Sequence, residues 1–192
     1  VQEEDEDGTI IKGDERRDVM ICNYKFTWDK EAYSHKKVIN KSGKDWYPGK
    51  WRREWMPIGY KDPNVTDVNF CYLRYADVVL MAAEAANEKN IPGEAIDYLE
   101  MVRARARGSN TNILPKVTTT DQGELREAIR HERRVELGLE FDRFYDLVRW
   151  GIAADVLHAA GKVNYQAKNA LLPLPQSEID KSKGVLVQNP DY

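Results

Sequence analysis

The chain has 192 residues and a formal net charge of −3, with 42% hydrophobic and 32% charged residues. That length suits one domain, or one domain with an additional lobe. The mildly acidic balance gives no electrostatic reason to expect a nucleic-acid partner. No apolar run approaches the roughly 20 residues that span a bilayer as a helix, so we expect no transmembrane segment.

Residues 1–69 are expected to form a small lobe with short strands and an irregular, aromatic-rich loop. Apolar residues alternate over residues 18–28, which is typical of a half-buried strand, and residues 38–39 are candidates for the start of another. Glycine, proline, lysine and aromatic residues dominate residues 42–63. Long irregular connections of this kind usually carry function or disorder.

Four aromatic residues gather in this loop, between lysines and arginines: Trp46, Tyr47, Trp51 and Trp55. The C–H faces of a pyranose stack on such rings while polar neighbours bond its hydroxyls, so the cluster is a candidate glycan platform. Core packing competes, because Trp51 and Trp55 would share one face of a short helix and tryptophans so placed are more often buried. Single-stranded nucleic acid is a weaker alternative, since the whole chain is acidic.

Residues 70–192 are expected to be mainly helical. The spacing of leucine and alanine predicts a helix over residues 73–90, and Pro92 fits the first turn of a second helix that Gly108 ends. Together, these two helices are expected to form an antiparallel hairpin of tetratricopeptide-like size. Such a hairpin needs neighbouring units to bury its remaining face.

A second helical hairpin is predicted further along the chain. Asp121 and Glu124 form a plausible capping pair at its start, Gly138 ends or bends its first helix, and residues 140–158 form the next helix. After Ala167 the chain continues as a proline-rich tail. We expect the apolar side chains of this tail to pack back on the helices, because they would otherwise stay in water.

The segment 125–151 is helical in period yet carries charge on faces that should be apolar. Its first helix places Glu132 and Glu136 on the buried side, and its second helix repeats arginines and an aspartate every three residues. Arginine grips carboxylates with two parallel hydrogen bonds, so we interpret the charges as a structural ion network between helices. Catalytic carboxylates are the rival interpretation. The network residues are Glu132, Arg133, Glu136, Arg143, Asp146 and Arg149.

Neither a catalytic nor a metal-binding motif is found, so we expect no enzyme activity, no cofactor and no metal. G-x-S-x-G, glycine-rich phosphate loops and H-E-x-x-H are absent, and the three histidines are isolated from cysteine or carboxylate pairs. Cys22 and Cys71 are too few for a disulfide framework. Two buried free thiols are the default expectation, although a bridge would be chemically allowed in an exported protein.

The segment 125–151 resembles the C-terminal signature of the SusD/RagB family, an ER-x-x-E run followed by R-aromatic-x-D-L-x-R-W. The matching residues are Glu132, Arg133, Glu136, Arg143, Asp146, Leu147, Arg149 and Trp150. Where many members carry Glu-Gly, this chain has Glu140-Phe141, which could change the local turn.

Other segments resemble the same family in the same order. Residues 73–87 are similar to its arginine-tyrosine-alanine helix, and residues 95–106 to the helix that follows. Residues 171–179 and 188–192 resemble its terminal proline-rich segment and its closing Gln-Asn-Pro-x-Tyr, and residues 14–16 match an Asp-x-Arg element. The resemblance therefore covers most of the chain.

The resemblance implies a surface-exposed lipoprotein of the outer membrane that binds starch or another oligosaccharide without cleaving it. Its partner would be a SusC-like TonB-dependent transporter, which receives the glycan. The chain opens at Val1 without a signal peptide or lipidation cysteine, so we expect a C-terminal portion whose lipid anchor lies elsewhere.

Two rival functions remain. One is a helical-repeat scaffold that binds peptides. The other is a helical glycosidase that uses two carboxylates from Glu132, Glu136, Glu140 and Asp146, which would have to face each other across an open cleft.

Overall fold

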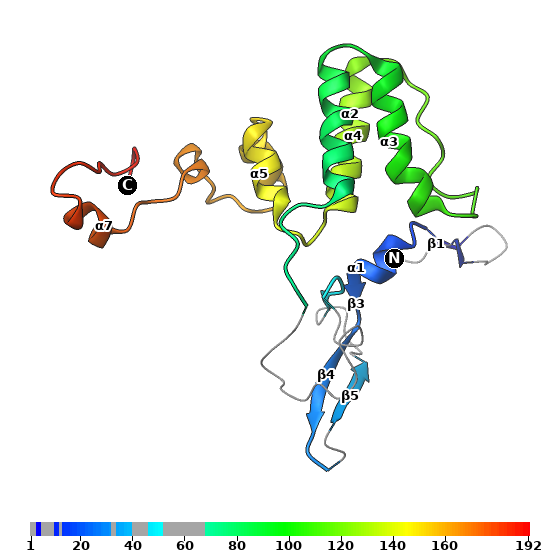
Figure 1. The fold of residues 1–192 in the computed structure, drawn as a ribbon, viewed down its shortest axis with the longest axis horizontal. Helices are drawn as coiled ribbons and strands as arrows, with labels where there is room; N and C mark the ends of the chain where they lie inside the picture. Colours follow the sequence, from blue (N-terminus) through cyan, green and yellow to red (C-terminus); the bar gives the residue numbers. More distant parts are fainter. Residues whose placement is uncertain (1–2, 5–9, 12, 32–33, 40–45, 52–67) are drawn as a thin grey trace. The chain divides into compact units, whose positions relative to one another are not determined.

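The computed structural model describes residues 3–4, 10–11, 13–31, 34–39, 46–51 and 68–192. Its contacts divide into two compact units, Val1–Phe141 and Asp142–Tyr192. The longest elements are helices and the short strands precede them in the chain (Figure 1). The expected mainly helical fold with a small β lobe is therefore confirmed. The expected domain boundary at residue 70 falls inside the first unit.

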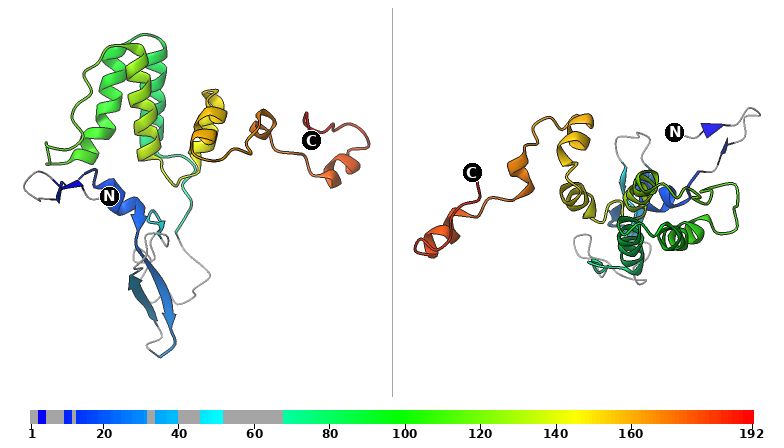
Figure 2. Two further views of the ribbon diagram at one scale, coloured as in Figure 1. Left: turned by 180° about the vertical axis from the view of Figure 1, so that it is seen from behind. Right: turned by 90° about the horizontal axis from the view of Figure 1, so that it is seen from above.

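Three helices form the core of the first unit: α2 (Tyr75–Glu88), α3 (Pro92–Arg107) and α4 (Gln122–Glu136). They lie side by side in all views of Figures 1 and 2. Leu80, Leu99 and Leu125 are fully buried between them. Small residues such as Ala83 and Ala95 have no exposed surface, which lets the helix backbones approach closely. The predicted hairpin is thus α2 and α3, and α4 covers it.

Polar contacts fix the start of α4 against the end of α2. The buried Asn87 donates from Nδ2 to the Gln122 carbonyl at 3.1 Å, and Gln122 donates back from Nε2 to the Asn87 carbonyl at 2.8 Å. The Asp121 carboxylate accepts a hydrogen bond from the Glu124 backbone N–H at 2.8 Å, so the predicted N-cap is confirmed. The Glu124 carboxylate itself accepts from Thr119 Oγ1.

In its described residues, the N-terminal lobe contains one short helix and three two-stranded antiparallel ladders. Helix α1 spans Arg16–Met20, and the ladders pair β1 with β2, β3 with β6, and β4 with β5. These strands are β1 (Glu3–Glu4), β2 (Ile10–Ile11), β3 (Ile21–Cys22), β4 (Tyr24–Asp29), β5 (Ser34–Ile39) and β6 (Tyr47–Pro48).

The single strand predicted over residues 18–28 is wrong at its start, because the chain is helical up to Met20. The Asp14 carboxylate accepts the Arg16 backbone N–H at 3.0 Å and thereby satisfies a first-turn donor of α1. Alternation of side chains cannot reveal such a local polar contact. The second predicted strand is present as β5, which begins earlier than residue 38.

The second unit contains α5 (Asp142–Arg149), α6 (Ala153–Ala159), the 3₁₀ helix η2 (Ala167–Ala170) and α7 (Gln176–Lys181). The predicted single helix over residues 140–158 is wrong, because it is interrupted at Gly151. This glycine has φ +70°, a left-handed conformation that ends α5. Ile152 then precedes the first residue of α6.

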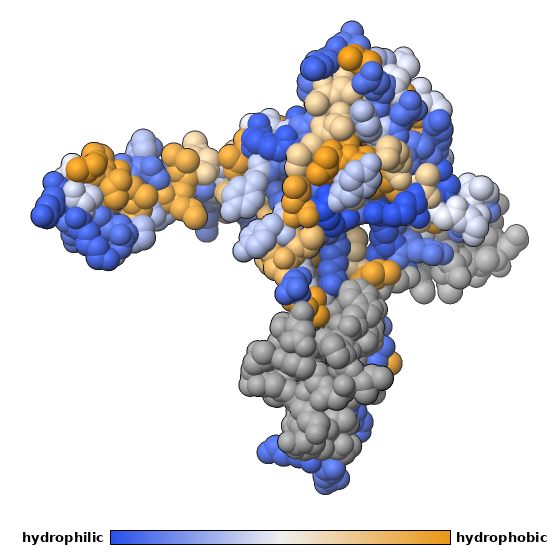
Figure 3. All heavy atoms as spheres, in the orientation of Figure 1, coloured by the Kyte–Doolittle hydropathy of each residue, from blue (hydrophilic) through white to orange (hydrophobic). Residues whose placement is uncertain are grey.

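The tail is held by polar contacts within the second unit. The Gln188 side chain accepts the Leu174 backbone N–H at 2.7 Å and donates to the Leu174 carbonyl at 2.9 Å. Leu172, Val185 and Val187 are exposed in the second unit. Packing of the tail on the helices of the first unit stays a prediction. Figure 3 shows hydrophobic residues at the surface of this part of the chain.

Gly138, just after α4, allows α1 to come close. A Cβ atom at this position would lie 2.6 Å from Met20 Cε and 3.1 Å from the Arg134 carbonyl oxygen. The methionine side chain can move, but the carbonyl belongs to the α4 backbone. Because glycine has no side chain, α1 and the end of α4 can approach each other at this position.

We expect Gly138→Ala to lower the free energy of unfolding by about 1 kcal/mol, because the added methyl crowds Met20 and the α4 backbone. Urea denaturation measures this change. Gly93→Ala is the matched control, since a Cβ there meets nothing within 4 Å and alanine favours a helix. Equal stability changes in the two variants would contradict the proposed close contact.

Candidate functional site

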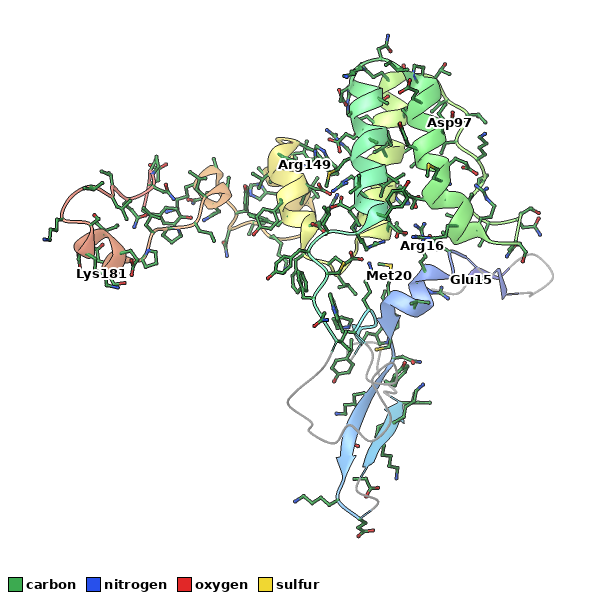
Figure 4. All side chains as sticks on the ribbon, in the orientation of Figure 1. Glu15, Arg16, Met20, Asp97, Arg149 and Lys181 are labelled. Carbon is green, nitrogen blue, oxygen red and sulfur yellow. The ribbon has the colours of Figure 1, made fainter. Side chains whose placement is uncertain are left out.

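A cluster of buried charges joins α1 to the ends of the core helices. Figure 4 shows Arg16 extending from α1 toward this region. Its Nη1 donates to Glu132 Oε1 at 2.5 Å and to Glu136 Oε2 at 2.8 Å. Its Nε and Nη2 donate to the Asp14 carboxylate. Burial alone would lower the pKa of Arg16, but its bonds to Asp14 and Glu132 outweigh burial and raise it, so the guanidinium stays charged.

Glu132 lies at the centre of this cluster, and its side chain has no exposed surface. Arg103 of α3 donates from Nη1 to Glu132 Oε2 at 2.8 Å and from Nη2 to the Pro115 carbonyl at 2.9 Å. Together with Arg16, each oxygen of the Glu132 carboxylate has a guanidinium partner. The carboxylate is therefore a structural link between α1, α3 and α4.

Glu136, one helical turn later, binds guanidinium groups from three segments. Besides Arg16, it accepts from Arg74 Nη1 at 2.6 Å and contacts Arg105 Nη2 at 2.5 Å. Burial alone would raise the pKa of Glu136. Hydrogen bonds from Arg105, Arg16 and Arg74 outweigh that effect and lower the pKa to about 2. Glu136 is therefore held as a carboxylate at neutral pH.

A further ion pair links α4 directly to α2. Arg133 donates from Nη1 to Asp77 Oδ1 at 2.8 Å, and both side chains are buried. Removing Arg133 would leave the buried Asp77 carboxylate without this guanidinium, which is an unfavourable state for a buried charge. This pair therefore adds a second electrostatic link within the helical core.

Glu140 extends the charged cluster toward the aromatic loop. Its carboxylate accepts from Arg74 Nε at 2.6 Å and from Lys50 Nζ, and the same ammonium donates to the Glu136 carbonyl at 2.8 Å. Burial lowers the pKa of Lys50 by more than its bond to Glu140 raises it. Lys50 thus connects the end of β6 to the turn after α4.

The remaining residues of the predicted network lie in the second unit. Arg149 donates from Nε to the buried Asp146 carboxylate at 2.9 Å, one turn apart in α5. The guanidinium carbons of Arg143 and Arg149 lie 5.8 Å and 4.9 Å from the ring centroid of Trp150. That these residues form one network with Glu132 and Glu136 stays a prediction. The arginines that bind the two glutamates come from outside residues 125–151.

A cavity of about 520 Å³ opens beside the charged cluster in the first unit. It combines ion-paired side chains with apolar and aromatic ones. The lining residues are Glu15, Arg16, Val19, Met20, Lys50, Trp51, Val68, Asn69, Cys71, Arg74, Arg105, Ala106, Glu136 and Glu140. The volume is within the range of small-molecule sites.

Of the four aromatics predicted to bind ligand, Trp51 lines this cavity and is partly exposed. Trp46, just before β6, is 53% exposed, and Tyr47, the first residue of β6, is 40% exposed. Trp55 lies outside the described residues. The structure therefore places one of these aromatics at the candidate site, and the packing expected between Trp51 and Trp55 stays a prediction.

Sequence reasoning missed three aromatic residues near Trp51: Phe70 and Phe141, which contact its ring, and Tyr72, which contacts Phe70. The rings of Trp51 and Phe70 are stacked, with centroids 6.0 Å apart and an interplanar angle of 13°. The Phe141 centroid lies 6.2 Å from Trp51 and 5.7 Å from Phe70, and Tyr72 meets Phe70 edge-on at 4.9 Å. We call these four residues the aromatic patch.

The backbone at Phe141 adopts a left-handed conformation, with φ +73°. Such a conformation is uncommon for any residue with a side chain and disfavours a bulky one by roughly 1–2 kcal/mol. Leu139 is also left-handed, with φ +67°. The replacement of the family's Glu-Gly by Glu140-Phe141 was the signal in the sequence, because glycine is the residue that takes this conformation freely.

Metal binding and disulfide formation have no support in the described part of the chain. No group of three or more His, Cys, Asp or Glu side chains is placed there to hold a metal ion. Cys22 is buried and Cys71 is exposed, and both are free thiols, so the expectation of burial is wrong for Cys71. Among the described helices, none has the length and apolarity to cross a membrane.

The fold and the charged cluster define a mainly helical, tetratricopeptide-like protein whose small N-terminal lobe is joined to the helices by buried salt bridges. The SusD family profile matches residues 2–192. The chain belongs to the SusD family.

Curated relatives carry the same family name. SusD-like protein P2 of Formosa agariphila is 36% identical over 134 residues, which cover 66% of this chain and 26% of that protein. SusD-like protein P25 of the same organism is 40% identical over 117 residues, covering 58% of this chain and 22% of that protein. The chain thus matches about a quarter of the length of these relatives.

Solved structures agree on the fold. A SusD superfamily protein from Bacteroides vulgatus matches with a TM-score of 0.63 at 23% identity, over 99% of this chain and 41% of that one. Surface glycan-binding protein A from Bacteroides thetaiotaomicron matches with a TM-score of 0.66 at 27% identity, over 93% of this chain and 38% of that one.

We expect acid to destabilise the protein through Glu136. Its folded pKa of about 2 lies below the ordinary value of 4.5, so its contribution is fully present above pH 4.5 and is lost as pH falls toward 2. The shift corresponds to about 3 kcal/mol. Glu136→Gln should therefore reduce stability by about that amount at pH 7, and by less at pH 3.

Urea denaturation at pH 7, 4.5 and 3 measures this difference. Glu127→Gln is the control on the same helix, because the Glu127 side chain is 70% exposed in its pair with Arg130. Exposed ion pairs contribute roughly 0–1 kcal/mol, so the free energy of unfolding of this variant should stay close to that of wild type. If the stability difference between wild type and Glu136→Gln were the same at all three pH values, the lowered pKa of Glu136 would be contradicted.

Proposed function

We propose that this chain takes part in non-catalytic binding of oligosaccharide at a bacterial cell surface. Membership of the SusD family and the likeness to a surface glycan-binding protein support this proposal. The observation that carries it is the cavity of about 520 Å³, which brings Trp51 next to hydrogen-bonding side chains. A site for a sugar needs both an apolar ring surface and polar groups for hydroxyls.

The cavity supplies both kinds of group at short range. Trp51 offers part of its ring, and the Arg105 side chain, which lines the same cavity, is 56% exposed. Lys50 and Arg74 line it as well, and each is ion-paired to Glu140. These pairs fix the positions of the polar groups, so a sugar would meet a preorganised surface.

The same ion pairs argue against a glycosidase. Glu132, Glu136 and Glu140 are each bonded to arginine or lysine. To act as the general acid of a glycosidase, Glu136 would need a raised pKa. The pKa of Glu136 is lowered instead. Asp146 is paired with Arg149 in the second unit. The acids therefore suit a scaffold better than a reaction centre.

A peptide-binding scaffold is the second candidate. A smaller cavity of about 340 Å³ lies along α2 and α3. Tyr75 and Met101 line it and are exposed, which suits an apolar peptide side chain. Peptide ligands therefore belong in the same binding experiment.

Delivery of the glycan to a SusC-like TonB-dependent transporter of the outer membrane is the further part of the proposal. The support is the family resemblance, in which the partner of the lipoprotein is such a transporter. In this arrangement the protein binds the oligosaccharide and the transporter supplies the energy-dependent step. A surface location would rest on a lipid anchor.

We expect the protein to bind at least one neutral oligosaccharide, with a change in tryptophan fluorescence and no release of reducing sugar. Trp51→Ala should weaken this binding roughly tenfold, because a stacked ring is lost. Isothermal titration calorimetry with oligosaccharides and peptides measures the affinities. Tyr145→Ala is the control, since Tyr145 is an exposed aromatic of α5 outside the lining. Release of reducing sugar, or binding of peptides alone, would contradict the proposal.

The transporter step is tested separately. When the protein and a SusC-like transporter are produced together, we expect both in the outer-membrane fraction and in one detergent-solubilised complex. Affinity purification through a tag on the transporter checks this. Recovery of the transporter alone would argue against delivery, even if glycan binding is observed.

A further inference from the structure

The aromatic patch (Trp51, Phe70, Tyr72 and Phe141) keeps a large ring surface in water. Tyr72 is 90% exposed, Phe141 71% and Phe70 41%. Residues of this size normally contribute to stability by being buried. Here they contact one another from three segments of the chain while remaining accessible. Their arrangement is therefore not explained by core packing.

Phe141 also carries a backbone penalty. Its left-handed φ of +73° is accessible to glycine without strain, and a glycine at this position would lose little packing because the ring is mostly exposed. Strained residues of this kind persist mainly at functional sites. What Phe141 adds to the molecule is its ring, beside Trp51 and Phe70.

The charges beside the patch are matched to one another. Arg74 and Lys50 bind Glu140, Arg105 binds Glu136, and these side chains line the cavity that Trp51 also lines. Because each cation has a carboxylate partner, a ligand with its own negative charge would have to compete with those carboxylates. A neutral ligand with hydroxyl groups can bond to the paired side chains without separating them.

We propose that the aromatic patch is a stacking subsite for a pyranose unit of a neutral oligosaccharide, and that Phe141 provides one of its ring surfaces. This inference rests on the proposed glycan-binding function and adds the location of a subsite and the charge class of its sugar. The tilted rings of Phe141 and Trp51, with an interplanar angle of 33°, present apolar surface to the C–H groups of the sugar. Paired polar groups of the neighbouring cavity bond the adjacent hydroxyls.

The test separates the ring from the backbone strain. Phe141→Gly removes both, so we expect its Tm to rise by about 3 °C and its affinity for the bound neutral oligosaccharide to fall about fivefold or more. Phe141→Leu keeps an apolar side chain and the strain, and should lose affinity without the rise in Tm. The probes are maltoheptaose, cellohexaose, xylohexaose and mannohexaose, with oligogalacturonate as the anionic comparison.

Leu139→Gly is the matched control. Leu139 has a similar left-handed φ of +67° and lies two residues away, but it has no aromatic ring. This variant should gain stability in the same way and bind the probes as wild type does. Differential scanning calorimetry and titration calorimetry on the same preparations measure the two effects.

The outcomes distinguish this inference from the proposed function. If wild type binds a neutral probe and both Phe141 variants bind it equally well, the subsite is wrong and glycan binding stands. If the protein bound oligogalacturonate more tightly than every neutral probe, the proposal that the ligand is a neutral sugar would be wrong. Loss of transporter binding with unchanged glycan affinity in the Phe141 variants would identify the patch as a protein contact. If wild type binds none of the probes, the proposed function fails together with the subsite.

Discussion

Arg16 and its carboxylate partners are the interaction on which the first unit depends. One guanidinium binds Asp14, Glu132 and Glu136, and thereby connects α1 to the end of α4. Withdrawing these charges from water is unfavourable by several kcal/mol per ion, and it is offset because each of the two buried glutamates is also bonded to arginines of other segments. The helical core, the lobe and the cavity beside them are positioned by this set of bonds.

The ion cluster also limits what the neighbouring cavity can do. Glu132 and Glu136 each use their carboxylate oxygens to bind guanidinium groups, and the pKa of Glu136 is lowered by these bonds. The same engagement leaves the polar side chains rigid, which favours recognition of a ligand over its chemical conversion. Family membership and the geometry of the cavity thus lead to the same proposal, a surface that binds sugars without cleaving them.

The acidic half of the cluster could be predicted from sequence, whereas the basic half could not. Helical periodicity placed Glu132 and Glu136 on a buried face of one helix. Their partner Arg16 is 116 and 120 residues away in the chain, and no local pattern reports such a contact. The break between α5 and α6 was missed for a related reason. The apolar stripe continues past Gly151, and only the left-handed backbone of Gly151 ends the helix.

For the site, Trp51 was among the predicted residues, but Phe70 and Tyr72 carry no motif that separates them from core aromatics.

The separation between Arg16 and its glutamate partners has a consequence for the order of folding. A contact that closes a loop of more than a hundred residues must offset the entropy of closing that loop. The contacts between neighbouring helices α2 and α3 close much shorter loops. We therefore expect these helices to pack before α1 docks onto the end of α4.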